Sequence, residues 1–281
     1  MPMQQRNSIL CPNCRKLISR NDPICPYCEI SNPGAAWKNN KLTRSLDRPD
    51  LILNAIVFTN IGMYLISLFF NPFQAGLTIN PLTFLSPDNS SLFLLGATGT
   101  IPIDRFDRWW TLLSANYLHG SVLHIFFNMM AIKQLAPFVM HEFGTSRMLI
   151  IYTVGGTIGF LVSFLARVEL TIGASAALCA LIGAILYYSK SRGGVYGQRL
   201  FKQVGVWVIG LFLFGLLVPG INNWGHGGGL VGGALLAYFL KYNETHHETH
   251  AHKVTAIFFV ILTVGVLAWA VASGIYYRIS G

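Results

Sequence analysis

Four polar residues stand in otherwise apolar stretches of the sequence, and their side chains are of the kinds that hydrolyse acyl bonds. They are His124, Asn128, Ser175 and His226. A serine hydroxyl becomes a nucleophile when a nearby imidazole takes its proton, and amide or imidazole N–H groups can stabilise an oxyanion. Singly, each has a structural interpretation: a serine can bond to the carbonyl one turn earlier, and an asparagine can join two helices. The chemical interpretation requires that the four side chains meet.

Four cysteines near the N-terminus form a second candidate site. Cys11 and Cys14 make one C-x2-C pair, and Cys25 and Cys28 make another ten residues later. Two tight turns that each offer two thiolates can close a tetrahedral Zn²⁺ site, with iron as the alternative metal. Two disulfides are the competing interpretation, which a reducing cytoplasm disfavours. Because four cysteines leave no position for water, we expect a structural ion.

The elements that hold the polar residues are predicted to be membrane-spanning helices. Of the 281 residues 53% are hydrophobic and 11% are charged, and the mean hydropathy is +0.50. Soluble domains carry about 25% charged residues, and about 20 apolar residues suffice to cross a bilayer. The sequence predicts seven spans, at residues 51–70, 121–140, 148–166, 174–189, 203–219, 225–241 and 254–274.

The distribution of basic residues indicates the orientation of these spans. If the N-terminus is inside, only four of the 20 Lys and Arg residues fall outside: Arg105, Arg108, Arg167 and Arg278. This positive-inside bias predicts a cytoplasmic N-terminus and an external C-terminus. It also accounts for the net charge of +9, so we expect a lipid bilayer, and no nucleic acid, as a partner.

In this orientation the second, fourth and sixth spans all begin at the outer face, where their polar residues share one depth. His124 and Asn128 lie four residues apart, on one face of the second span. Ser175 and His226 open the fourth and sixth spans. Small residues at four-residue spacing would let these two helices approach closely: Ser175, Cys179 and Gly183 on one, and Gly225, Gly229, Gly233 and Ala237 on the other.

None of the eleven acidic residues falls inside a predicted span. A buried Ser-His-Asp triad and the carboxylate relay of proton-driven transporters are therefore both excluded. If Ser175 is a nucleophile, His226 must act as its base in a dyad. The start of a helix at Ser175 would supply backbone N–H groups and a favourable dipole for an oxyanion, Gly173 permits an unusual backbone there, and His124 and Asn128 could add side-chain donors.

These residues, in this order and on alternate spans, resemble the motifs of the rhomboid intramembrane serine proteases. The resemblance covers roughly residues 51–241. It implies a six-helix core with the seventh span appended, a water-filled cavity open to the outer face, and cleavage of membrane-anchored substrates. It also implies that the serine attacks, the sixth-span histidine is the base, and the second-span pair holds the oxyanion. The matching motifs are His124-x3-Asn128, Gly173-x-Ser175 and His226-x2-Gly229-x3-Gly233.

The sequence departs from the family pattern at three places. Trp110 is followed by Thr111 where the family usually has arginine, and Arg108 stands two residues before the tryptophan. Cys179 occupies a position that commonly holds an aromatic residue, and the residue after the serine is Ala176 in place of a frequent glycine. The two residues of the dyad are present.

We therefore predict an all-α polytopic membrane protein: a zinc ribbon at 1–32, a linker at 33–50, a rhomboid-like six-helix core at 51–241, and an inner loop with a seventh helix at 242–281. The expected activity is that of an intramembrane serine endopeptidase acting on transmembrane protein substrates near the outer face of a bacterial plasma membrane. Zinc would not take part in catalysis, and the ribbon could bind a cytoplasmic protein. The alternative is a catalytically silent relative that binds transmembrane helices. A transporter or channel would show intramembrane charges or inverted repeats.

Three further features have simple expected roles. The segment from Arg105 to Leu113 mixes charge, tryptophan and leucine, as an interfacial loop does. His119 and Cys179 are expected to pack. The histidine-rich tract between Lys241 and Lys253 could chelate a metal, but we expect a solvated inner loop.

Overall fold

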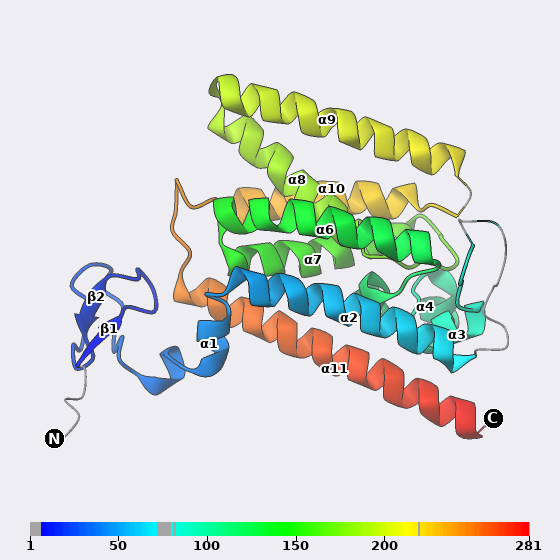
Figure 1. Cartoon of the computed structure of the whole chain (residues 1–281), viewed down its shortest axis with the longest axis horizontal. Coiled ribbons are helices and arrows are strands. Elements are labelled where there is room, and N and C mark those ends of the chain that lie inside the picture. Colours follow the sequence, from blue (N-terminus) through cyan, green and yellow to red (C-terminus); the bar gives the residue numbers. More distant parts are fainter. Residues whose placement is uncertain (1–6, 72–79, 81–82, 219, 281) are drawn as a thin grey trace.

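The computed structural model describes residues 7–71, 80, 83–218 and 220–280. Within them, seven long helices form a bundle, and a small β-hairpin lies apart at one end of it (Figure 1). The long helices are α2 (Pro49–Phe70), α6 (Val122–Phe143), α7 (Thr145–Leu165), α8 (Ser175–Arg192), α9 (Gly194–Leu217), α10 (Asn223–Leu240) and α11 (His250–Ser280).

Each of the seven predicted spans is a helix in the structure, which confirms the all-α polytopic fold. The largest differences in bounds are at α9, which begins before its apolar run, and at α11, which extends beyond its run at both ends. Hydropathy marks only the apolar part of a helix, whereas backbone hydrogen bonds continue into polar residues. The predicted bounds are therefore shorter than the helices.

Short elements occupy the N-terminal region and the connection between α2 and α6. The antiparallel hairpin pairs Leu10 with Leu17. Part of the connection between the first two predicted spans, which we expect to be external, and residues 1–6 of the predicted ribbon lie outside the described residues. The short elements are β1 (Ser8–Leu10), β2 (Leu17–Ser19), η1 (Ala36–Lys38), α1 (Lys41–Ser45), α3 (Asn89–Leu94), α4 (Thr100–Phe106), α5 (Thr111–Ser114) and η3 (Ala115–Tyr117).

Five of the long helices described are long and apolar enough to cross a membrane: α2, α6, α7, α9 and α11. The other two, α8 and α10, pack against each other and against α7. Most of α8 is buried, and the buried residues of α10 are five glycines and one alanine. Because these two helices face protein, small residues replace the large apolar ones that lipid would favour. By contrast, only Gly197 and Val204 are buried in α9, which lies at the outside of the bundle (Figure 1).

The crossing of α8 and α10 is close enough to exclude side chains. A Cβ atom on Gly229 would collide with the carbonyl oxygen of Ala176, and one on Gly233 would collide with that of Ala180. From the other side, a Cβ on Gly183 would collide with the carbonyl oxygen of Leu230. The close approach predicted from the four-residue spacing of small residues is therefore present.

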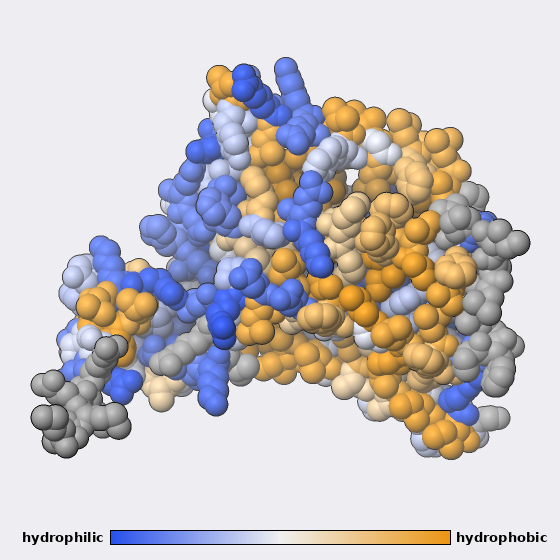
Figure 2. Space-filling view, in the orientation of Figure 1, coloured by the Kyte–Doolittle hydropathy of each residue, from blue (hydrophilic) through white to orange (hydrophobic). Residues whose placement is uncertain are grey.

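The surface of the bundle is hydrophobic over the helices and hydrophilic at the end that carries the hairpin (Figure 2). Large apolar side chains of α9 and α11 are exposed, among them Phe212, Leu217 and Phe258. Soluble monomers rarely expose continuous apolar surface of this extent. A bilayer around the helices accounts for it.

Candidate active site and metal centre

The structure brings Ser175 and His226 together where α8 and α10 begin. Ser175 is the first residue of α8, and His226 lies in the first turn of α10. The distance from Nε2 of His226 to Oγ of Ser175 is 2.9 Å. Both residues are partly buried and partly exposed, so a reactant could reach them. A serine hydroxyl that donates to an imidazole nitrogen at this distance is poised for proton transfer.

The other ring nitrogen of His226, Nδ1, is buried and has no hydrogen-bond partner among the described residues. In a Ser-His-Asp triad this nitrogen would donate to a carboxylate that orients the ring. Here the orientation of the ring must come from packing and from the backbone of α10. This arrangement agrees with the dyad expected from the absence of acidic residues in the spans.

His124 lies near Ser175, next to Gly173. The backbone N–H of Gly120 donates to its Nδ1 at 3.3 Å, so Nε2 carries the proton and is a donor. Gly173 has φ +128°, and a Cβ there would lie 2.8 Å from Nε2 of His124 and 3.5 Å from Oγ of Ser175. Only glycine keeps open the space between the hydroxyl and the imidazole donor.

Asn128 is connected to the space beside Ser175 by its contact with His124. It is buried, and its Nδ2 donates to the carbonyl oxygen of His124 at 2.8 Å. The first hydrogen bond within α8 runs from Leu178 N to Ala174 O, and the N–H groups of the preceding helical residues have no acceptor within the helix. These N–H groups and Nε2 of His124 are the donors best placed for an oxyanion.

The loop before α6 is anchored by Arg108, a role that the sequence analysis did not find. Its guanidinium donates to the carbonyl oxygens of Phe93 at 2.8 Å and Leu94 at 3.0 Å. It also lies 4.7 Å from the ring centroid of Trp110. A cation at the C-terminal carbonyls of α3 is favourable. In the sequence, the signal that could have indicated this role was the position of Arg108, two residues before Trp110. The interfacial position of this loop stays a prediction.

His119 and Cys179 pack, as expected. His119 is fully buried, with its ring edge-to-face against His124 at 5.0 Å between centroids. Cys179 is 1% exposed, and its Cβ would lie 3.3 Å from a Cβ on Gly229. Its small size suits the closely packed helix crossing.

Among the described residues, the four N-terminal cysteines are the cluster of potential ligand side chains that could hold a metal ion. Their sulfur atoms all lie within 4.8 Å of one another. Cys11 and Cys28 are 3.7 Å apart at Sγ, as are Cys14 and Cys25. A disulfide requires about 2.05 Å, whereas Zn–S bonds of about 2.3 Å in a tetrahedron place the sulfurs about 3.8 Å apart. The geometry fits a tetrathiolate metal site.

The thiols of this cluster differ in their ease of ionisation. Burial raises the pKa of Cys11 to about 12. Burial also opposes ionisation of Cys28, but hydrogen bonds from the Asn13 side chain and the Ile30 backbone outweigh it and lower the pKa to about 6. Asn13 therefore supports a thiolate at one corner of the cluster.

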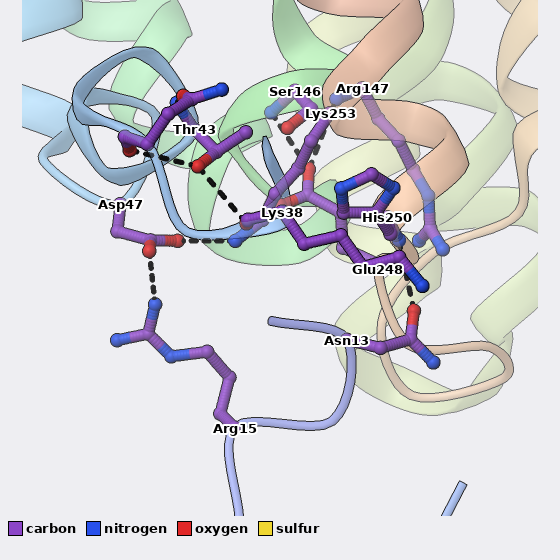
Figure 3. A network of polar contacts seen from close by, with 11 residues as sticks. Asn13, Arg15, Lys38, Thr43, Asp47, Ser146, Arg147, Glu248, His250 and Lys253 are labelled. Atoms are coloured by element: carbon purple, nitrogen blue, oxygen red, sulfur yellow. Dashed lines mark hydrogen bonds and ion pairs between the residues drawn. The ribbon is translucent and has the colours of Figure 1, made fainter. Parts of the chain in front are cut away.

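A polar network joins the cysteine region to the bundle (Figure 3). Oδ1 of Asn13 accepts from the backbone N–H of His250, the first residue of α11, at 2.9 Å. Asp47 pairs with Arg15 at 2.5 Å and with Lys253 at 2.8 Å. Lys253 is buried, so its pairing with Asp47 offsets the cost of burying its charge.

A second part of the network fixes the loop between α10 and α11. Glu248 accepts from the backbone N–H groups of Ser146 at 2.7 Å and Arg147 at 3.2 Å, at the start of α7 (Figure 3). Arg147 is fully buried. Its guanidinium donates to the carbonyl oxygens of Phe143, Lys241, His246 and His247. The histidine-rich tract is thus held by its backbone, and neither Glu248 nor Arg147 was singled out by the sequence analysis.

Comparison with known proteins agrees with the fold. A family model described as the rhomboid domain matches residues 107–243, which include all four candidate residues of the active site. YdcA of Bacillus subtilis is 30% identical over 133 residues, which cover 47% of this chain and 67% of that protein. The chain belongs to the rhomboid family and is an integral membrane protein.

Two longer relatives match a similar part of the chain. RHOMBOID-like protein 4 of Arabidopsis thaliana is 32% identical over 163 residues, covering 57% of this chain and 41% of the relative. Rhomboid protease GluP of Bacillus subtilis is 31% identical over 166 residues, which cover 59% of this chain and 32% of that protein. The chain thus spans less than half the length of these two relatives.

Proposed function

We propose that this protein is an intramembrane serine endopeptidase that cleaves membrane-anchored protein substrates near the outer face of the membrane. The observation that carries the proposal is the 2.9 Å contact between Oγ of Ser175 and Nε2 of His226, at the start of two closely packed helices. The family membership and the name of the relative GluP add support.

In the proposed reaction, Oγ of Ser175 attacks the carbonyl carbon of the scissile peptide bond while its proton passes to Nε2 of His226. Backbone N–H groups at the start of α8 and Nε2 of His124 donate to the resulting oxyanion. As the tetrahedral intermediate collapses, the C–N bond breaks and the leaving amine takes the proton from His226. Water then hydrolyses the acyl-enzyme with His226 again as base, which restores the serine.

His124 and Asn128 are proposed to form the side-chain part of the oxyanion hole, with different roles. His124 presents a protonated Nε2 toward the space that Gly173 keeps open. Asn128 bonds to the carbonyl of His124, which orients the turn that carries the imidazole. We propose that its second amide hydrogen donates to the substrate.

The cysteine cluster is proposed to hold a structural Zn²⁺ that takes no part in peptide cleavage. The network from this region reaches Ser146, at the start of α7, whereas Ala176, next to Ser175, packs beside Gly159 of the same helix. At 1.5 Å per residue, Ser146 and Gly159 are about 20 Å apart along α7. An ion at that distance cannot contact the reacting atoms.

The domain bounds and orientation are part of the same proposal. We assign a zinc ribbon to 1–32, a linker to 33–50, the catalytic core to 51–241, and an inner loop with an appended helix to 242–281. The bias of basic residues supports a cytoplasmic N-terminus and an external C-terminus in a bacterial plasma membrane. The ribbon is then available to a cytoplasmic protein partner.

Labelling with a serine-directed fluorophosphonate tests the activity. Purified protein in detergent should be labelled covalently and should cleave a model transmembrane substrate in liposomes, and Ser175→Ala should do neither. Proteolysis by the purified Ser175→Ala protein would contradict the mechanism. A folded wild type that is inert in both assays but binds transmembrane helices would favour the silent alternative.

A further inference from the structure

Asn222 lies immediately before α10 and makes hydrogen bonds in two directions. Toward α10, its Oδ1 accepts from the backbone N–H of Gly225 at 3.0 Å, so it caps the helix. Its own carbonyl oxygen accepts from the backbone N–H of His226 at 3.1 Å. The backbone of the proposed base is thus bonded directly to this residue.

In the other direction, the amide of Asn222 contacts two different segments. Its Nδ2 donates to Oγ of Ser163, on α7, at 2.7 Å, and to Oγ1 of Thr171 at 2.9 Å. Thr171 lies four residues before Ser175. Its backbone is held by Thr98 through two hydrogen bonds, of 2.7 and 3.1 Å. One side chain therefore links the helix of the base to the segment that leads to the nucleophile.

The contacts of Asn222 can take over the orienting role for which His226 has no hydrogen-bond partner. Because Nδ1 of His226 has no partner among the described residues, no hydrogen bond at that nitrogen fixes the ring. The position of Nε2 then depends on where α10 begins relative to α8. We propose that Asn222 is a positioning residue, whose carboxamide sets the start of α10 against α7 and Thr171 so that His226 meets Ser175. The inference rests on the proposed function.

The chemistry of the contacts requires an amide of this length. The site uses one acceptor, for Gly225, and two donor hydrogens, for Ser163 and Thr171. Asparagine carries both on one short, rigid group. Serine could cap the helix but could not also reach both hydroxyls, and alanine could do neither.

The packing around the carboxamide leaves little freedom for compensation. A Cβ on Gly225 would lie 3.0 Å from both Nδ2 of Asn222 and Oγ of Ser163. A Cβ on Gly159 would lie 2.6 Å from the carbonyl oxygen of Gly225. The start of α10 is thus seated directly on α7, and loss of the amide would shift it without another side chain to take its place.

The test uses the full-length protein and compares turnover, KM, fluorophosphonate labelling rate and thermal unfolding. Asn222→Ala should lower kcat by about 10- to 100-fold, the scale expected when catalytic groups are misplaced by about 1 Å. Its KM should stay near the wild-type value, because the proposed role of Asn222 is to position His226 and not to contact the substrate. Labelling should slow in parallel, since the small probe needs only the serine and its base. Asn222→Ser, which keeps a cap, should show the same kinetic loss with a smaller loss of thermal stability.

Thr171 provides the matched pair of variants. Thr171→Val removes the hydroxyl while keeping the shape and the backbone bonds to Thr98, and it should lower kcat and labelling. Thr171→Ser keeps the hydroxyl and should be close to wild type. Thr157→Val, which breaks a hydrogen bond within α7 only, should leave kinetics unchanged.

Two results would overturn the inference. One is wild-type kcat and labelling in folded Asn222→Ala. The other is a loss of activity in Asn222→Ala that its lowered unfolding temperature explains entirely, together with equal losses of activity in Thr171→Ser and Thr171→Val. Neither would affect the proposed function, because the wild type would still cleave. An inert wild type would instead remove the proposed function, and this inference with it.

Discussion

The two candidate sites of this protein are held in place by opposite means. Ser175 and His226 stand at the ends of long helices whose backbones touch, and glycine is required where they cross. The four cysteines stand on a two-stranded hairpin and two turns. The hydrophobic core of that unit consists of Cys11, Ile18 and Cys25. One site is therefore built by packing, and the other by its own ligands.

The difference predicts different dependences on the surroundings. A unit of about thirty residues cannot bury enough apolar surface to be stable alone, so metal binding must supply much of its folding free energy. The helix crossing has the reverse property. It needs no ion, but it has no space for one extra methyl group. Each prediction below perturbs one of the two sites and leaves the other intact.

The largest expected effect is on the dyad. Ser175→Ala and His226→Ala should each remove nearly all cleavage, and the double variant should be scarcely slower than either single variant, because residues that act as a unit are non-additive. Cleavage rates of purified, folded variants measure this. The cysteine cluster should retain its metal in all three. Multiplicative losses in the double variant would show that the two residues act independently.

Loss of an oxyanion donor should be milder. His124→Ala and Asn128→Ala should lower kcat by about 10²–10³ at most, the cost of removing one such donor. Because Nε2 of His124 points toward the space beside Gly173, while Asn128 bonds to the backbone of His124, we expect the larger loss for His124→Ala. Steady-state kinetics with a model transmembrane substrate would show this order. The reverse order would place Asn128 as the principal donor.

A pair of neighbouring glycines tests the packing of α10. Gly229→Ala places a methyl group against the carbonyl oxygen of Ala176, whereas a Cβ on Gly227 would meet nothing within 4 Å. Overpacking of this kind costs about 1–3 kcal/mol. Gly229→Ala should therefore lower both the unfolding temperature and the cleavage rate, and Gly227→Ala should change neither. Equal behaviour of the two variants would contradict the close crossing.

The sequence predicted those features that depend on local composition and spacing. Apolar runs gave the seven helices, four-residue spacing of small residues gave the crossing of α8 and α10, and paired cysteines gave the cluster. It did not predict Asn222, Arg147 or Glu248. The partners that give these residues their tertiary roles lie 51 to 102 residues away in the chain, and their residue types are common in loops and at helix ends. Such roles depend on the tertiary arrangement, which spacing along the chain does not encode.

The smallest expected effect on cleavage is that of metal removal, and it separates the two sites. In a Cys179→Ala background the thiols that remain are Cys11, Cys14, Cys25 and Cys28. The folded protein should contain one Zn²⁺ by metal analysis and should react slowly with a thiol reagent. A strong chelator should release the ion and expose all four thiols, because the hairpin unfolds without its ligand.

Cleavage by the metal-free protein should be unchanged, since the helix crossing is independent of the ion and about 20 Å of α7 separates Ser146 from Gly159, beside which Ala176 packs. The change should be confined to the network around the ribbon, where Asn13 contacts His250 and Arg15 contacts Asp47. Hydrogen exchange at the start of α11 should therefore increase, while exchange at α8 and α10 should not. Loss of cleavage with α8 and α10 still protected would mean that the ribbon acts on the dyad through α7 or α11, and the two sites could no longer be treated as independent.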